Sequence, residues 1–242
     1  MTYSIVWFKR DLRLHDHLAL HTAIGRGPVL CLYVVEPSLW AQADVANQHY
    51  QFLLESLREL YAALRKGGGQ LHILTGEVTE VFAHIFAHQP FSAIYSHEET
   101  GNDVTYQRDK ALGRWCKARQ IEWHEFAQFG VVRRLQNRDD WQARWNAHND
   151  LACVPTPDLS RASFVGLMPG ISLPQLPPSS EELQLDGYDP PKRQRGGRRN
   201  GLITLDSFLH ERSHQYRGGI SSPFVGTNSL FALVTVSGVW LP

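Results

Sequence analysis

The sequence has few cysteines, no net charge and no long apolar run. Its three cysteines, Cys31, Cys116 and Cys153, lie far apart without a Cys-x-x-Cys pair, which argues against a zinc site or a disulfide framework and favours a reducing, cytoplasmic setting. The 24 Lys and Arg residues balance 24 Asp and Glu residues, so any contact with nucleic acid must come from a local patch. No apolar run approaches the ~18 residues of a membrane span. Lys9 and Arg10 follow the first apolar run, the reverse of a signal peptide, so no membrane partner is expected.

Short runs of β-branched and aromatic residues alternate with amphipathic segments along the first half of the chain. The runs are continuous, as is typical of strands buried on both faces of a parallel sheet. This rhythm predicts an α/β fold with a five-stranded, parallel, doubly wound (Rossmann-like) sheet, and 3-2-1-4-5 is the commonest strand order for it. We expect strands at 3–8, 29–35, 71–75, 91–96 and 121–126, and helices at 16–24, 47–66, 77–88 and from Asp103 or Thr105 to 119.

Two charged loops are expected to meet in this sheet. The strand order places the switch point between the first and fourth strands, so the loops that follow Phe8 and Ser96 face one another. The first loop, residues 9–16, and the second, residues 97–103, are equally polar. They predict a small-ligand site in the crevice. The alternative is a pair of solvated loops that neutralise each other, in which Asp16 only caps the next helix.

Two further motifs do not point to a binding site. His84 and His88 stand four residues apart on a predicted helix, a spacing that can hold a metal. The sequence offers no third ligand, so we expect packing or surface histidines and no metal site. The glycine triplet at 67–69 precedes a strand and lacks a following Lys-Ser/Thr pair, so it predicts a turn and not a phosphate cradle.

Prolines change the character of the chain after residue 135. Eight of them punctuate residues 155–191, where little periodicity remains, and this predicts a long interdomain connector over 136–199. Trp141 and Trp145, four residues apart, are expected on a short helix that covers the first domain.

A basic cluster at residues 192–199 precedes a predicted helix at 201–215. Its Arg195, Arg198 and Arg199 can contact nucleic-acid phosphates without reading a base sequence. The alternative for this cluster is a solvated loop.

Three stretches resemble the DNA photolyase/cryptochrome family. Residues 5–20 read IVWFKRDLRLHDHLAL, which is similar to the family's W-F-[KR]-x-D-L-R-x-x-D turn, and QFGVVRRL at 128–135 resembles its exit from the first domain. Residues 196–216 resemble the entry into the family's second, all-helical domain, where Tyr216 falls on a tyrosine that contacts the FAD phosphates. The resemblance implies an antenna-type α/β domain at 1–135, the connector, and a stub of the all-α FAD-binding domain at 200–229.

The resemblance also implies an activity and its cofactors. Family members carry out light-driven, FAD-dependent repair of pyrimidine dimers in DNA, or blue-light signalling, so FAD and DNA are the implied cofactor and partner. The first domain often carries an antenna pigment, a folate or a deazaflavin, and the second charged loop lies in the region that helps to hold it. We therefore take Glu98, Asn102 and Asp103 as candidate contacts to such a pigment.

The last thirteen residues depart from the family. Residues 230–242 read LFALVTVSGVWLP, whereas the family has a segment like S-R-L-S-P-Y-L-A-x-G. One choice of codons for residues 231–242, read one base later, spells LRLSPYLAFGCL. We hypothesise a single-base insertion near the codons for Ser229 and Leu230, in the gene or in its sequence record.

We therefore expect a truncated chain with an aberrant apolar tail, which lacks most of the FAD and substrate site and is inactive by itself. The alternatives are a free-standing α/β module that binds an antenna pigment or a nucleotide, and a stub that docks on a partner supplying the missing half.

Overall fold

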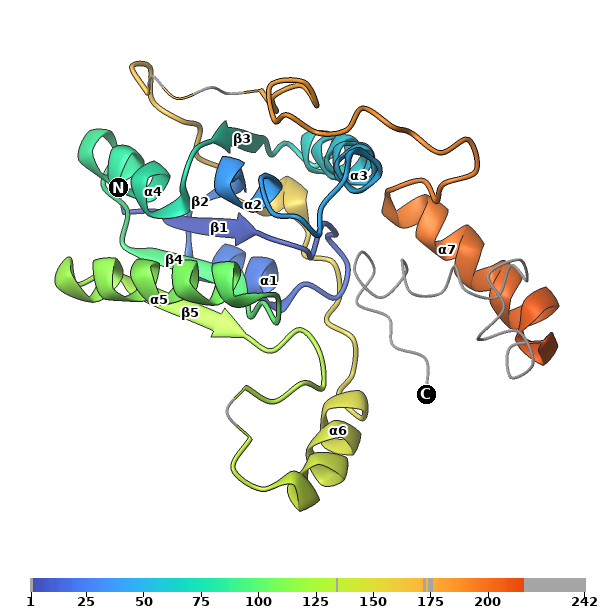
Figure 1. Ribbon diagram of the computed structural model, residues 1–242. Helices are drawn as coiled ribbons and strands as arrows, with labels where there is room; N and C mark the ends of the chain where they lie inside the picture. Colours follow the sequence, from blue (N-terminus) through green and yellow to red (C-terminus); the bar gives the residue numbers. More distant parts are fainter. Residues whose placement is uncertain (1, 134, 172, 174–175, 216–242) are drawn as a thin grey trace.

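Five parallel strands form one sheet in the order β3-β2-β1-β4-β5 (Figure 1). The computed structural model describes residues 2–133, 135–171, 173 and 176–215. The α/β class and the strand order are both as predicted. The strands are β1 (Ser4–Phe8), β2 (Val29–Val35), β3 (Leu71–Thr75), β4 (Ala93–His97) and β5 (Glu122–Phe126). The α-helices are α1 (Leu18–Arg26), α2 (Pro37–Trp40), α3 (Asn47–Lys66), α4 (Val78–His88), α5 (Asp103–Ala118), α6 (Trp141–Asn149) and α7 (Arg198–Ser207).

The continuous apolar run of β1 reflects helices on both faces of the sheet. Successive side chains of a strand point to opposite faces. Val6 and Phe8 pack with residues of α1 and α3, whereas Ile5 and Trp7 pack with residues of α4 and α5. Since both faces are covered, every position of β1 after Ser4 is buried, and the strand cannot show the alternation of a half-exposed sheet.

Two helices begin differently from the prediction. Asp16, the expected cap of the first helix, has a left-handed backbone with φ of 51° and accepts a hydrogen bond from Val154 N, so His17 caps α1 instead through Nδ1. The cap of α5 is Asn102, whose Oδ1 accepts from Thr105 N at 3.2 Å, in place of Asp103 or Thr105. In both cases an acceptor side chain one position away satisfies a free amide of the first turn.

The connector packs back onto the α/β domain. Val29 N donates to Ser163 O at 2.9 Å, and Val165 N donates to Val29 O at 2.8 Å, so residues 163–165 run beside the start of β2. Leu159 and Leu183 are buried in the core on the α1 and α3 side. The proline-punctuated segment, although aperiodic, therefore contributes to the hydrophobic core.

The end of the connector is fixed on α3. Glu55 accepts hydrogen bonds from Arg193 at 2.8 Å, from Arg195 at 3.0 Å and from Gly196 N at 2.7 Å. A Cβ atom at Gly196 would lie 2.0 Å from the carbonyl oxygen of Phe52, so only glycine allows this approach. The positive neighbours and the amide outweigh partial burial and lower the pKa of Glu55 to about 2.

The tryptophan pair lies on a short helix, as predicted, and Trp145 contacts the first domain at its last loop and not at the sheet. Trp141 and Trp145 stack on α6 with ring centroids 5.3 Å apart, but α6 buries none of its residues and stands apart from the sheet in Figure 1. Trp145 instead lies against Gly130 in the loop after β5. The spacing of the pair predicted the helix correctly, and Trp145 meets the first domain at this loop.

The last described helical segment begins three residues earlier than expected. It comprises α7, a π-helical turn (Phe208–Arg212) and a 3-10 turn (Ser213–Gln215). Phe208 is buried, whereas Leu202 and Leu209 are exposed. Within the described ranges, no helix combines the length and apolarity needed to cross a bilayer.

Candidate functional site

The loops after β1 and β4 are joined by one buried carboxylate. Asp11, which is fully buried, accepts from Lys9 N at 2.7 Å, and its Oδ2 lies 2.5 Å from His97 Nδ1 and 2.8 Å from His17 Nε2. The two imidazole rings touch, with centroids 4.5 Å apart. We call Asp11, His17 and His97 the buried triad. It fixes the switch-point loops directly to each other and to the start of α1.

The triad has the composition of a metal site, but the position of the ring proton of His17 argues against a metal ligand at its Nε2. Its ligand-type atoms lie within 4.8 Å of one another. Nδ1 of His17 accepts from Leu20 N at 3.0 Å, so the ring proton of neutral His17 must sit on Nε2, which faces the carboxylate. A protonated nitrogen cannot ligate a metal. The triad therefore joins the loops after β1 and β4 to each other. The sequence analysis did not predict that these three residues meet.

Burial sets the protonation of His17. It lowers the pKa of the imidazole to about 4 in spite of the neighbouring Asp11. For Asp11, burial alone would raise the pKa, but the interactions with His17 and His97 outweigh it and hold that pKa well below its usual value. At neutral pH the triad thus contains a carboxylate and a neutral His17.

A buried, neutral His17 makes the unfolding free energy depend on pH, and the substitution His17→Asn should remove this dependence. The unfolded chain protonates this histidine near pH 6.5 and the folded chain near pH 4, so His17 contributes stability above pH 6.5 that is lost as the pH falls to 4. We expect the difference in unfolding free energy between wild type and variant to fall by about 3 kcal/mol over this window. Asparagine can still cap α1. Denaturant titrations across the window measure the difference.

The matched control is His21→Asn, at an exposed position of the same helix. Groups that do not contact His17 titrate alike in wild type and in both variants, and therefore cancel. A pH-independent difference for His17→Asn would show that His17 is not neutral and buried in the folded protein.

Arg108 of α5 lies among three carboxylates beside the triad. Its guanidinium is 2.7 Å from Glu36, 2.6 Å from Glu99 and 2.8 Å from Asp109. Burial alone would lower the pKa of Arg108, but these carboxylates raise it instead. Lys9 Nζ lies 3.3 Å from Asp109. We call Lys9, Glu36, Glu99, Arg108 and Asp109 the charged network; it links the ends of β1, β2 and β4 to α5.

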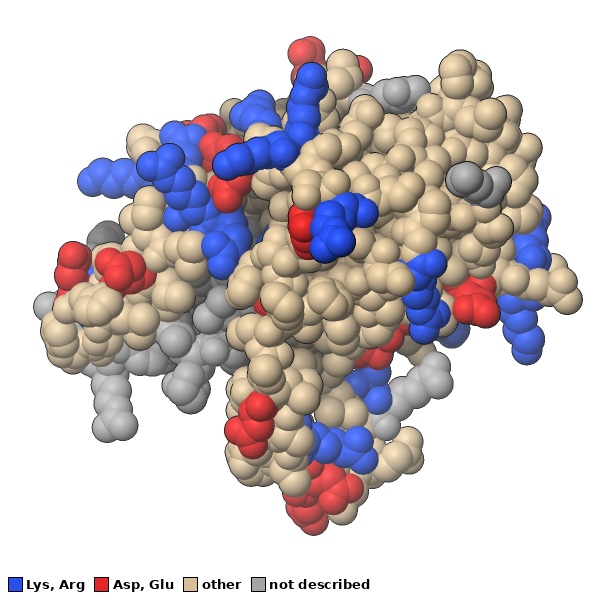
Figure 2. All heavy atoms as spheres, turned by 180° about the vertical axis from the view of Figure 1, so that it is seen from behind, with Lys and Arg blue, Asp and Glu red and all other residues tan. Residues whose placement is uncertain are grey.

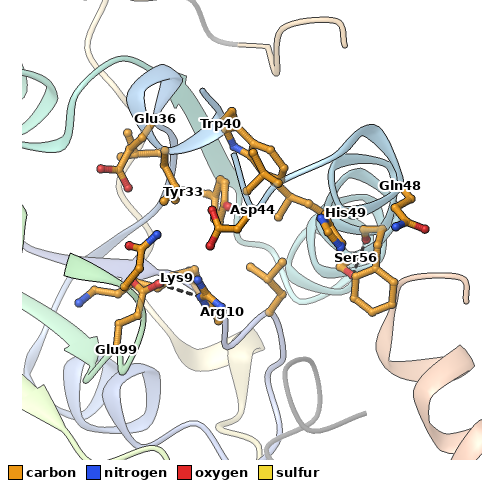
Figure 3. Close-up of a pocket in the computed structure, with 18 of the residues that line it drawn as sticks. Lys9, Arg10, Tyr33, Glu36, Trp40, Asp44, Gln48, His49, Ser56 and Glu99 are labelled. Carbon is orange, nitrogen blue, oxygen red and sulfur yellow. Dashed lines mark hydrogen bonds and ion pairs between the residues drawn. The ribbon is translucent and has the colours of Figure 1, made fainter. Parts of the chain in front are cut away.

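A cavity of about 580 Å³ opens between this network and α3. Figure 3 shows the side chains around it: Lys9, Arg10 and Glu99 come from the switch-point loops, Tyr33, Glu36 and Trp40 from the end of β2 and from α2, and Gln48, His49 and Ser56 from α3. Arg10 Nε donates to Glu99 at 2.8 Å across its floor. The cavity thus combines aromatic rings with charged groups of both signs, as small-molecule sites do.

Glu36 and Glu99, two of the three carboxylates that line the cavity, titrate differently. Burial raises the pKa of Glu36 to about 7 in spite of Arg108. Burial also acts to raise the pKa of Glu99, but the charges of Arg108, Arg10 and Lys9 outweigh it and lower that pKa. At neutral pH Glu36 is therefore partly protonated, whereas Glu99 is ionised.

Of the three residues predicted to contact a pigment, Glu98, Asn102 and Asp103, only Asn102 lies at the cavity. Glu98 points elsewhere, with its carboxylate 3.9 Å from Arg133, and Asp103 is exposed and accepts from Gln107 at 3.1 Å. Glu99, between them, faces the cavity instead. The role of all three in pigment binding stays a prediction.

The predicted nucleic-acid contacts also differ from one another. Arg195 is held by Glu55 although its side chain is about half exposed, Arg198 is partly buried, and Arg199 is exposed. On the face in Figure 2, Lys and Arg side chains are interspersed with Asp and Glu, in keeping with the zero formal charge. Tyr216 and residues 230–242, with the frameshift hypothesis, lie outside the described residues.

Comparisons with known proteins agree with the architecture. A family model described as DNA photolyase matches residues 4–136. Cryptochrome-2 of Gallus gallus is 33% identical over 123 residues, which make up 49% of this chain and 20% of that protein.

Two solved structures share the fold. The cryptochrome of Synechocystis sp. PCC6803 superposes with a TM-score of 0.71 at 24% identity, over 90% of this chain and 48% of the other. The archaeal photolyase of Sulfolobus tokodaii, described with two FAD molecules and an implied novel light-harvesting cofactor, gives a TM-score of 0.64 at 24% identity, over 84% and 46%. The chain thus spans about half the length of these structures.

Proposed function

This chain belongs to the DNA photolyase/cryptochrome family, and from that premise we propose that its α/β domain holds a light-harvesting pigment, a folate or a deazaflavin, in the switch-point cavity. The observation that carries the proposal is the cavity itself. Its volume of about 580 Å³ falls within the range of small-molecule and cofactor sites. The photolyase of Sulfolobus tokodaii, described with a second FAD as an implied light-harvesting cofactor, supports a second chromophore in such a protein.

The chemistry of the walls suits a planar heterocycle with polar edges. Trp40 and Tyr33 offer aromatic surface against which a ring can pack. Glu36 and Glu99 can accept hydrogen bonds from ring N–H groups, and Arg10 can attract a carboxylate or phosphate tail. A nucleotide shares these features and remains the alternative ligand.

For the whole protein we propose the family's activity, which is light-driven, FAD-dependent repair of pyrimidine dimers in DNA or blue-light signalling. The repair alternative requires DNA, and Arg195, Arg198 and Arg199 are the contacts proposed for its phosphates. The residues that follow the connector would begin the FAD-binding domain. That residues 1–242 by themselves retain no stoichiometric FAD and repair no dimers stays a prediction.

Filling the cavity tests the pigment proposal. Val45 lines the cavity, so Val45→Trp places an indole in the space that the ligand needs. We expect wild type to bind a folate or a deazaflavin saturably and the variant to bind it at least tenfold more weakly, a loss of about 1.4 kcal/mol. Near-ultraviolet absorbance of the purified protein and fluorescence titration of each pigment measure the binding.

The matched control is Leu151→Trp, which adds the same ring at an exposed position. It should bind like wild type. Equal binding by all three proteins, or none by wild type, would contradict the proposal, and binding of adenine nucleotides alone would favour the alternative. The same spectra report FAD, and bound FAD together with light-dependent repair would contradict the inactivity of this polypeptide.

A further inference from the structure

A second cavity adjoins the first. It has a volume of about 340 Å³ and lies between the loop after β1, helix α3 and the first residue of α7. Leu12 lines both cavities, so they are neighbours. Leu14, Leu60 and Ala63 give the second cavity an apolar wall. Neither the pigment proposal nor the ordering of the loops uses it.

Arg13 lines this cavity, and one nitrogen of its guanidinium has no hydrogen-bond partner among the described residues. Arg13 is 4% exposed; its Nε donates to His15 O and Asp16 O at 3.1 Å, and its Nη2 donates to Asp16 O at 2.7 Å. Nη1 is buried without a hydrogen bond among the described residues. Leaving such a donor unsatisfied in a buried place destabilises the fold. The fold therefore holds Arg13 through Nε and Nη2, and leaves Nη1 without a hydrogen bond among the described residues.

A second positive group lies in the same wall. Arg198 lines the cavity at the first position of α7, where the helix N-terminus adds partial positive charge. Burial lowers the pKa of Arg13, and the charge of Arg198 lowers it further against the opposing effects of Asp11 and Asp16. Glu59 is the acidic residue of the described lining, and its carboxylate already accepts from Arg199 N at 3.0 Å. Two guanidinium groups therefore line one cavity, and the carboxylate of Asp16 lies 3.8 Å from Nη2 of Arg13.

We propose that this cavity binds a phosphate group carried on a small apolar or aromatic molecule, with Arg13 Nη1 and Arg198 as its ligands. Guanidinium groups bind phosphate oxygens by charge-assisted hydrogen bonds, and a phosphate would satisfy the orphaned donor of Arg13. The apolar wall of Leu14, Leu60 and Ala63 receives the organic part.

Binding of phenyl phosphate and of inorganic phosphate to the 242-residue protein tests the proposal. We expect saturable binding by calorimetry, with phenyl phosphate the tighter ligand because it also covers the apolar wall. Arg198→Gln should weaken phenyl phosphate binding about tenfold or more, which corresponds to about 1.4 kcal/mol. The matched control is Arg199→Gln, next in sequence but exposed, which should stay within about twofold of wild type. Adenosine monophosphate forms a separate arm and reports whether a nucleotide or a smaller phosphate fits.

The outcomes are distinct. Absent binding by wild type, or equal weakening by Arg198→Gln and Arg199→Gln, overturns the proposal, because general charge attraction would then explain any effect. Arg13→Lys keeps the charge but loses the guanidinium fork and should also weaken binding; if it does not fold, Arg198→Gln decides alone. Val45→Trp should bind phenyl phosphate like wild type, so failure of the pigment proposal leaves this proposal intact.

Discussion

Replacing Asp11 by alanine is expected to lower the unfolding free energy by about 3–5 kcal/mol, the usual cost of removing one partner from a buried charged network. The substitution leaves Lys9 N–H and His97 Nδ1–H, both bonded to this carboxylate, without an acceptor in a fully buried place. It also leaves the protonated nitrogen of His17 facing a void. Urea denaturation, with a check that the slope m is unchanged, measures the loss.

The control for this substitution is Asp140→Ala. Asp140 is exposed and makes no capping hydrogen bond through its side chain, so its loss should change the unfolding free energy by less than about 0.5 kcal/mol. Asp11→Asn should fall between the two, because it keeps an acceptor for Lys9 N but offers N–H groups to donors. A cost for Asp11→Ala as small as that of the control would mean that the triad does not hold the switch-point loops together.

The sheet was predictable because its determinants are local. The apolar run of β1 requires cover on both faces, and the regular alternation with amphipathic helices then leaves few orders for a parallel sheet. The meeting of the loops after Phe8 and Ser96 followed from that order, and the contact between Asp11 and His97 agrees with it. The charges of these loops do pair with each other, but Lys9, Asp11 and His97 are buried and not solvated, and the small-ligand site beside them stays a prediction.

The partners within the site could not be predicted, because they come from residues that look ordinary in sequence. His17 read as part of a helix start, and Asp109, 100 residues from Lys9, read as a polar position of a long helix. Helix α2, which brings Trp40 to the cavity, has four residues and is too short to show a periodicity. Side chains such as these are identified only once the fold brings them together.

Replacing Arg108 by glutamine is expected to cost about 3–5 kcal/mol at neutral pH, again because buried charges lose their partner. The guanidinium is the shared counter-ion of Glu36, Glu99 and Asp109, each within 2.8 Å of it. Arg108→Lys keeps a charge but cannot reach three carboxylates with a planar fork, so it should lose an intermediate amount. Arg114→Gln, at an exposed position of the same helix, is the matched control and should change little.

The pH dependence of the stability lost in Arg108→Gln shows whether the loss comes from the carboxylates that the arginine neutralises. Without Arg108 the folded-state pKa values of Glu36 and Glu99 should rise, and Glu36 already titrates near pH 7 with the arginine present. A carboxylate whose folded pKa lies above its unfolded value of 4.5 contributes stability that is present below pH 4.5 and lost as the pH rises through the folded pKa. The deficit of Arg108→Gln relative to wild type should therefore be largest at about pH 8 and shrink toward about pH 5. A deficit of equal size at both ends would assign the loss to packing of the arginine stem and not to the uncompensated carboxylates.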